Sequence, residues 1–272
     1  MAAPICLSAL HCYPVKSLRG VTLDRSRVDG FGLVHDRRWM VVDGDGGFLS
    51  QRELPRMALV GVEVASDGLL LTAPEMPSLQ VDRPTFAAAR VEVEVWQDRL
   101  EGSVVAQQAD AWLSRFLGVE CRLVYMMDDV KRQVDQRYAE PRHLTAFSDG
   151  FPLLLTSEAS LEELNGRLES PLSMARFRPN LVVSGSLPYA EDRWARIRIG
   201  TMELRLVKPC SRCSITTVDP ASGTRGVEPL ATLAAYRRRG KQVFFGQNLI
   251  YDRPSELRVG MSVEVLEYRD EE

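Results

Sequence analysis

The sequence has few of the features that mark secreted or nucleic-acid-binding proteins. Only 5 of its 272 residues are cysteine, too few for a dense disulfide framework, which indicates a reducing compartment. The formal net charge is −3, so the chain has no basic excess with which to bind nucleic acid or anionic lipid. Any anion must therefore be bound by a few placed arginines rather than by a general positive field.

Long apolar segments are also missing. No uninterrupted apolar run is long enough to cross a bilayer, and residues 1–10 lack the basic region and apolar stretch of a secretory signal. The composition, with 45% hydrophobic and 26% charged residues, is that of a globular protein with a substantial core. We therefore expect a soluble, cytoplasmic protein that binds neither membrane nor nucleic acid.

Motifs for common redox groups are absent as well. The glycines of residues 44–47 lie in a predicted hairpin turn between strands, not between a strand and a helix, so they do not form a dinucleotide-binding turn. The Cys-x4-Cys-x2-Cys spacing of an iron–sulfur cluster does not occur. We predict that the isolated protein cannot take electrons from NADH or NADPH.

Short strands dominate both halves of the chain. Helices are predicted at residues 107–117, where Trp112 and Phe116 share one apolar face and Gly118 ends the helix, from Ser157 or Ser160 onward, and at residues 228–239. Strands are predicted at residues 5–13, 21–28, 39–42, 48–50, 58–65, 69–72, 91–96, 119–126, 151–155, 181–184, 196–199, 202–208, 214–218, 243–251 and 262–268.

Such short, alternating strands favour barrels or strongly bent sheets over a doubly wound fold. The predicted fold class is therefore mostly β with a few helices (α+β), arranged in two β-barrel-like units. The charged segment of residues 128–143 has little periodicity and is expected to be a linker or a loop over the site. We place the domain boundary at its start, which gives domains at residues 1–127 and 128–272.

Cys210 and Cys213 are the first candidates for chemistry. They lie three positions apart with Arg212 between them, and a thiolate is the ligand that a soft or high-valent metal prefers. Half of a zinc site is disfavoured because the other cysteines form no second pair at ligand spacing. A thioredoxin-type pair is disfavoured because residues 214–218 are predicted to form a strand rather than a helix. Burial as a small apolar side chain remains an open alternative for Cys210.

Several anion-binding side chains lie where strands or helices begin. Lys16 and Ser17 share one turn, although a solvated lysine is an equally good explanation. The hydroxyls near Ser157 begin a helix and could bind an anion, but this segment alone favours simple helix capping. Arg37 and Arg38 are adjacent, so at most one of them can point into a given site.

Eight short motifs follow one another along the chain. They are Tyr13–Ser17, Asp36-Arg37 before Trp39, Phe147–Asp149, Ser157–Leu161, Phe177–Asn180, Tyr189–Asp192, Pro209–Cys213 followed by Thr216–Pro220, and Phe245–Gln247. Together they resemble the MOSC-domain proteins, most closely the amidoxime-reducing molybdenum enzymes, and the resemblance runs from about Leu7 to the carboxyl terminus. It implies a MOSC N-terminal β-barrel domain at residues 1–127, a MOSC domain at residues 128–272, and a molybdenum cofactor between them.

The resemblance also implies roles for single residues. Cys213 would be the metal ligand and catalytic residue, and Lys16, Arg37 and Arg178 suit the phosphate of a pyranopterin. Asn248 stands where some relatives carry tyrosine near the cofactor. The implied cofactor contacts are Lys16, Ser17, Arg37, Ser157, Arg178, Asn180, Ser211, Arg212 and Asn248.

The implied function is a molybdenum-dependent reductase of N-hydroxylated compounds such as amidoximes, hydroxylamines and N-hydroxylated bases. Electrons would come from a separate ferredoxin-like protein or flavoprotein, and Arg132, Arg137 and Arg142 make residues 128–143 a candidate dock for an acidic carrier. An ordinary solvated loop is the alternative for that segment. The alternatives for the whole protein are a sulfur-transfer protein, since MOSC domains also occur in cofactor sulfurases, and a non-enzymatic molybdenum-cofactor carrier.

Overall fold

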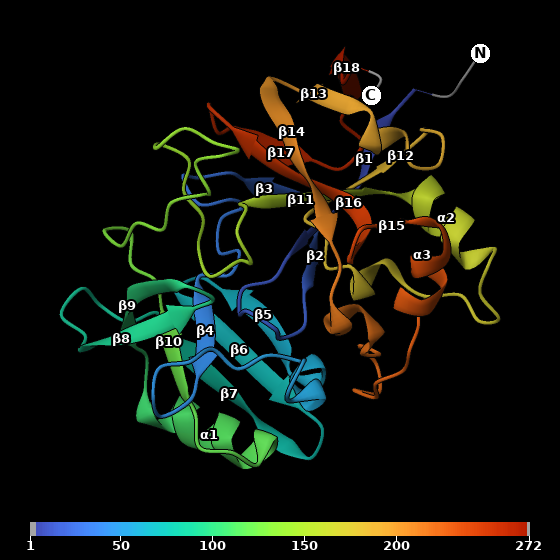
Figure 1. Ribbon diagram of the computed structural model, residues 1–272. Coiled ribbons are helices and arrows are strands. Elements are labelled where there is room, and N and C mark those ends of the chain that lie inside the picture. The colour runs from blue at the N-terminus through green and yellow to red at the C-terminus, as the bar shows by residue number, and fades with distance from the viewer. Residues whose placement is uncertain (1–3, 271–272) are drawn as a thin grey trace.

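The computed structural model describes residues 4–270 and is mostly β, which confirms the predicted fold class (Figure 1). None of the described helices is long and apolar enough to span a membrane. The α-helices and strands are β1 (Cys6–Cys12), β2 (Val21–Leu23), β3 (Arg25–Arg27), β4 (Trp39–Val42), β5 (Gly61–Ala65), β6 (Gly68–Ala73), β7 (Met76–Asp82), β8 (Arg90–Val95), β9 (Asp98–Val104), α1 (Gln107–Leu117), β10 (Arg122–Tyr125), β11 (Leu153–Ser157), α2 (Glu158–Asn165), β12 (Leu181–Ser184), β13 (Trp194–Ile199), β14 (Met202–Ser211), α3 (Leu230–Tyr236), β15 (Arg238–Arg239), β16 (Gln242–Tyr251), β17 (Glu256–Arg258) and β18 (Val263–Tyr268).

The largest sheet joins the two ends of the chain. Its order is β18-β13-β14-β16-β11-β12-β1-β2, and β15 pairs with β16 outside this path. The amino-terminal strand β1 pairs antiparallel with β12, so the turn that follows β1 lies near the loop that precedes β12. Buried side chains such as Leu10, Leu155 and Leu204 form the core on this sheet. The sheet therefore brings residues from distant parts of the sequence to one place.

Two smaller sheets form the other side of the molecule, with orders β4-β10-β9-β8 and β5-β6-β7 (Figure 1). Helix α1 covers residues 107–117 as predicted, because the apolar face with Trp112 and Phe116 packs into a core that includes Trp39. Gly118 ends the helix with a left-handed φ of 75°, which a glycine adopts without steric cost.

Some predicted elements differ in the structure. Residues 214–217 form a 3₁₀ helix and not a strand, because the Thr216 and Thr217 hydroxyls donate to the Cys213 and Ser214 carbonyls at 3.0 and 2.8 Å. Such local side-chain bonds compete with strand pairing. Pro55 begins a second 3₁₀ helix (Pro55–Leu59) that replaces the start of the strand predicted at residues 58–65. The remaining 3₁₀ helices are Met174–Arg176 and Ala190–Asp192.

Three further differences concern strands. Phe48 forms a single bridge with Val42 rather than a strand over residues 48–50. The helix predicted at residues 228–239 ends at Tyr236, and residues 238–239 pair with β16 instead. Strands β7, β9 and the short β17 were not predicted. Pro77 within β7 and the charged start of β9 obscure the alternation on which strand prediction depends.

Residues 128–143 form a loop that ion pairs connect to both parts of the molecule. Arg132 is buried and donates to Asp98 at 2.7 Å. Arg137 pairs with Asp135, and Arg142 pairs with Asp252 at 2.6 Å. The prediction that these three arginines form a docking surface is therefore wrong for Arg132, which a carrier cannot reach, and the other two already have acidic partners.

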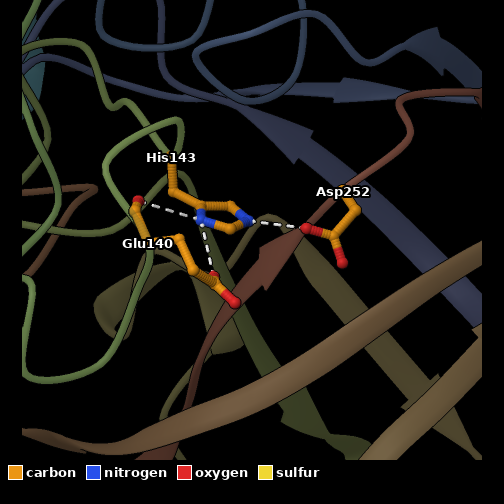
Figure 2. A group of neighbouring side chains, drawn as sticks. All are labelled: Glu140, His143 and Asp252. Atoms are coloured by element: carbon orange, nitrogen blue, oxygen red, sulfur yellow. Dashed lines mark hydrogen bonds and ion pairs between the residues drawn. The ribbon is translucent and has the colours of Figure 1, made fainter.

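A buried histidine closes this loop against the large sheet. His143 lies between Glu140 and Asp252, at 3.1 and 3.0 Å from their carboxylates (Figure 2). Arg205 of β14 also contacts Glu140 at 2.7 Å, and this hydrogen bond lowers the pKa of Glu140 to about 2. Arg205 and Arg142 thus balance the charges of the Glu140 and Asp252 carboxylates. The cluster is therefore an ion-pair network that fixes the loop rather than a metal site.

Candidate functional site

A cavity of about 200 Å³ lies where the loop after β1, the loop before β12 and the end of β14 meet. The sequence-predicted residues that line it are Lys16, Ser17, Arg37, Arg178, Asn180, Ser211, Arg212, Cys213 and Asn248. They come from both halves of the chain, and the pairing of β1 with β12 brings them together. The structure therefore collects all the predicted site residues except Ser157 around one space.

Ser157 lies outside this cavity. It is fully buried at the start of α2, where its hydroxyl accepts from the Ser160 backbone N–H at 3.1 Å and donates to Glu191 at 3.1 Å. Ser157 is therefore the N-cap of α2, which decides between the two helix starts, Ser157 and Ser160, that the sequence left open. Because its hydroxyl is already bonded on both sides, we remove Ser157 from the set of candidate cofactor contacts.

Three cavity residues have a left-handed backbone. The φ angles of Ser17, Arg37 and Arg178 are 67°, 49° and 54°. This conformation is uncommon and costly for residues other than glycine, and it concentrates at functional sites. The guanidiniums of Arg37 and Arg178 also lie 4.3 and 4.2 Å from the centre of the same ring, that of Tyr13. The backbone and one aromatic ring thus hold two like charges side by side.

Two of the cavity cations have acidic partners. Arg37 donates to Asp36 at 2.6 Å, and Lys16 donates to Asp149 at 2.6 Å. Burial lowers the pKa of Lys16 to about 8, and Asp149 offsets this effect only in part. Arg38 does not line the cavity and donates to Asp128 at 2.6 Å. Only one of the two adjacent arginines thus enters the site, but the cause is the turn with a left-handed φ at Arg37 and not strand alternation, since β4 begins at Trp39.

The other two cavity guanidiniums have no acidic partner among residues 4–270. Arg178 donates to the Leu18 carbonyl at 2.7 Å and Arg212 to the Phe177 carbonyl at 2.7 Å. The Nη2 of Arg178 and the Nε of Arg212 are buried without any hydrogen-bond partner in the described structure. Burial lowers the pKa of Arg178 to about 10, and repulsion from Arg37 adds to this effect. Two uncompensated charges with unused donors fit a dianionic group such as a phosphate monoester.

The two cysteines complete the cavity. Both are free thiols of intermediate exposure that line it. Arg212 contacts the sulfur of Cys210 at 2.8 Å, and Arg52 lies 3.5 Å from the sulfur of Cys213. These polar surroundings exclude the alternative that the pair consists of buried apolar side chains. Within the described residues no histidine or carboxylate group joins them at metal-ligand distances, so half of a zinc site is also unsupported.

Sequence reasoning missed two charged residues beside the thiols. Arg52 lies 3.9 Å from Asp149 and 4.5 Å from the centre of the Trp96 ring, and nothing in its loop sequence pointed to the site. Asp149 belongs to the motif Phe147–Asp149, but no role was predicted for it. In the structure it pairs with Lys16 at 2.6 Å. The side chain of Asp149 is exposed, and the charges of Lys16 and Arg52 hold its pKa below the ordinary value.

Comparison with known proteins identifies the family. The MOSC N-terminal beta barrel domain matches residues 5–120, and the MOSC domain matches residues 142–264. The chain is 36% identical to mitochondrial amidoxime-reducing component 1 of Xenopus laevis over 93% of this chain and 80% of that protein. The human protein of the same name is 35% identical over 96% and 82%. A molybdenum cofactor sulfurase of Solanum lycopersicum is 31% identical over 93% of this chain but only 33% of that protein. The chain therefore belongs to the MOSC-domain family that includes the mitochondrial amidoxime-reducing components.

Proposed function

We propose that the protein is a molybdenum-cofactor-dependent reductase that removes the hydroxyl oxygen from N-hydroxylated compounds. The observation that carries the proposal is the combination, in one cavity, of two uncompensated guanidiniums with a free thiol. The names of the amidoxime-reducing relatives support the same reaction.

The cavity residues divide into two sets. Arg178 and Arg212 would bind the cofactor phosphate with the donors that are unused in the described structure, and Lys16 and Arg37 would add charge. Ser17, Asn180, Ser211 and Asn248 offer hydroxyl and amide groups for the polar edges of the pterin.

The thiol supplies the remaining contact. Cys213 would hold the metal through its sulfur, which is the ligand type that such a metal prefers. When bound, the cofactor supplies a metal centre that accepts oxygen and exchanges two electrons. The overall reaction consumes two electrons and two protons and releases the amine or amidine with water. We propose that a separate ferredoxin-like protein or flavoprotein delivers the electrons.

Elemental analysis combined with one assay tests the proposal. Protein produced in a host that makes the cofactor should contain molybdenum and should reduce benzamidoxime with reduced methyl viologen. Cys213→Ser should be inactive in this assay. Absence of molybdenum from the folded wild type contradicts the proposal, and molybdenum without any reduction favours a cofactor carrier.

The second candidate is sulfur transfer, which the similarity to the molybdenum cofactor sulfurase favours. A sulfur-transfer protein would carry sulfane sulfur on a cavity cysteine. Cyanide would release this sulfur as thiocyanate from wild type and not from the matching cysteine variant. We expect no such release.

A further inference from the structure

The turn between β15 and β16 carries an exposed group of cations that we call the basic hairpin, residues 238–241. Arg238, Arg239 and Lys241 are exposed, and Gly240 makes the turn with a left-handed φ of 58°. No ion pair or side-chain hydrogen bond connects these three cations to another described residue. Some exposed arginines elsewhere have acidic partners, as Arg142 has in Asp252 at 2.6 Å, whereas Arg25, Arg27 and Arg115 form no ion pair in the described structure.

The basic hairpin lies next to the cysteine segment. Arg238 pairs with Val243, and the carbonyl of Val243 accepts from the backbone N–H of Arg212 at 2.7 Å. Because neighbouring strands are about 4.8 Å apart, the backbone of Arg238 lies roughly 10 Å from that of Arg212. Figure 1 shows β15 beside β16 and α3, far from the sheet of β8 and β9. Two strand spacings therefore separate the backbone of Arg238 from that of Arg212, the residue before Cys213.

The neighbourhood of the hairpin adds positive charge. Burial lowers the pKa of Arg269, and although Asp192 opposes this effect, Arg239 lowers the pKa further. Arg239 thus faces another cation, while the chain as a whole has a net charge of −3. A local positive surface on an acidic protein attracts an acidic partner and directs it to that place.

We propose that the basic hairpin is the docking surface for an acidic protein that carries single electrons, such as an iron–sulfur protein. This inference rests on the proposed function, since it names where the reductant binds. The carrier would donate two electrons in successive encounters, and with two protons they convert the N–OH group to N–H and water. Docking at the hairpin would bring the carrier beside the strand that ends in the cysteine segment.

A charge-reversal variant tests the surface. R238E/R239E/K241E changes only exposed side chains outside the cavity. R25E/R27E/R115E is the matched control, because its three arginines are also exposed, form no ion pair in the described structure, and change the net charge equally. Each protein is assayed for benzamidoxime reduction with reduced methyl viologen, and separately with a plant-type [2Fe–2S] ferredoxin reduced by NADPH through its flavoprotein reductase. Calorimetry measures ferredoxin binding without turnover.

We expect the hairpin variant to keep the viologen-driven rate while its kcat/KM for ferredoxin falls by about 10-fold or more at low salt. As salt rises from about 20 to about 200 mM, the kcat/KM of wild type and control for ferredoxin should fall toward that of the hairpin variant, because salt screens exposed charges. Calorimetry should show weaker ferredoxin binding only for the hairpin variant.

Other outcomes overturn the inference. Equal loss in both variants would assign the effect to net charge, and salt-independent or undetectable ferredoxin binding to wild type would reject an acidic partner. Binding to phosphatidylserine vesicles that only the hairpin variant loses, with ferredoxin binding unchanged, would assign the surface to a membrane. A wild type that binds ferredoxin at the hairpin but reduces no benzamidoxime with viologen would reject the proposed function and leave the surface standing.

Discussion

Replacing Arg178 by glutamine should separate cofactor binding from the stability of the protein. The pKa of Arg178 falls from 12.5 to about 10 on folding, and each unit is worth about 1.4 kcal/mol. Keeping this guanidinium charged therefore costs the cofactor-free fold about 3 kcal/mol, and the cost is present at every pH below about 10. Glutamine removes that cost together with the charge.

The lost contacts nearly offset this gain. The hydrogen bond from Arg178 to the Leu18 carbonyl, at 2.7 Å, contributes about 1.5–3 kcal/mol because its donor is charged. We therefore expect the unfolding free energy of the cofactor-free variant to lie within about 1.5 kcal/mol of wild type. Breaking an ordinary buried ion pair would cost about 3–5 kcal/mol.

Cofactor content should change far more. A phosphate left without its guanidinium partner binds more weakly by about 2–5 kcal/mol, which is about 30-fold to several thousand-fold. Urea unfolding of the cofactor-free protein and the molybdenum-to-protein ratio of the loaded protein measure the two effects. Arg176→Gln is the matched control, because Arg176 lies two residues away and pairs with Asp219 at 2.8 Å. Equal molybdenum in wild type and Arg178→Gln would show that Arg178 does not bind the cofactor phosphate. Molybdenum loss that only follows a large loss of stability would assign the effect to folding instead.

Three further predictions concern the thiols, the buried lysine and the electron source. Cys213→Ser should abolish benzamidoxime reduction while the fold survives, whereas Cys210→Ser should keep substantial activity; the reverse result would reassign the ligand. Since burial lowers the pKa of Lys16 from 10.5 to about 8, the unfolded chain binds more protons between these values, so the stability of the cofactor-free protein should rise with pH there. Urea unfolding measured across that pH range should show a smaller rise of the unfolding free energy with pH in Lys16→Met than in wild type. The same rise in both proteins would contradict the lowered pKa of Lys16. Loaded protein given NADPH and benzamidoxime should turn over only when a carrier and its reductase are added, and steady turnover with NADPH alone would reveal an internal redox centre.

The sequence predicted helix α1 and most of the cavity for different physical reasons. Trp112 and Phe116 have the spacing of one helix face, and Gly118 marks the helix end. These signals lie within a few residues of one another, so they can be read without the rest of the chain. The cavity residues are far apart in sequence, and only their family motifs indicated that they meet. Composition alone would have left Lys16 a surface lysine, whereas the structure places it in the cavity with 6% of its side chain exposed.

The failures depend on contacts that local patterns do not contain. Ser157 fits both a helix cap and a ligand contact, and its bonds to the Ser160 N–H and to Glu191 decide for the cap. Arg132 belongs to a charged, aperiodic segment, but its pairing with Asp98 buries it. Arg52 contacts Cys213, but the two residues are far apart in the sequence and Arg52 belongs to none of the recognised motifs. Residues 238–239 continue a helical pattern, yet the turn at Gly240 pairs them with β16.

We propose that Cys213 binds molybdenum in a cavity whose arginines hold the cofactor. X-ray absorption at the molybdenum edge tests it most directly on loaded wild type, Cys213→Ser and Cys210→Ser. We expect the wild-type metal to have one more sulfur neighbour than the metal in Cys213→Ser, and Cys210→Ser to match wild type. An unchanged sulfur count in Cys213→Ser, or a loss of sulfur in Cys210→Ser alone, would contradict it.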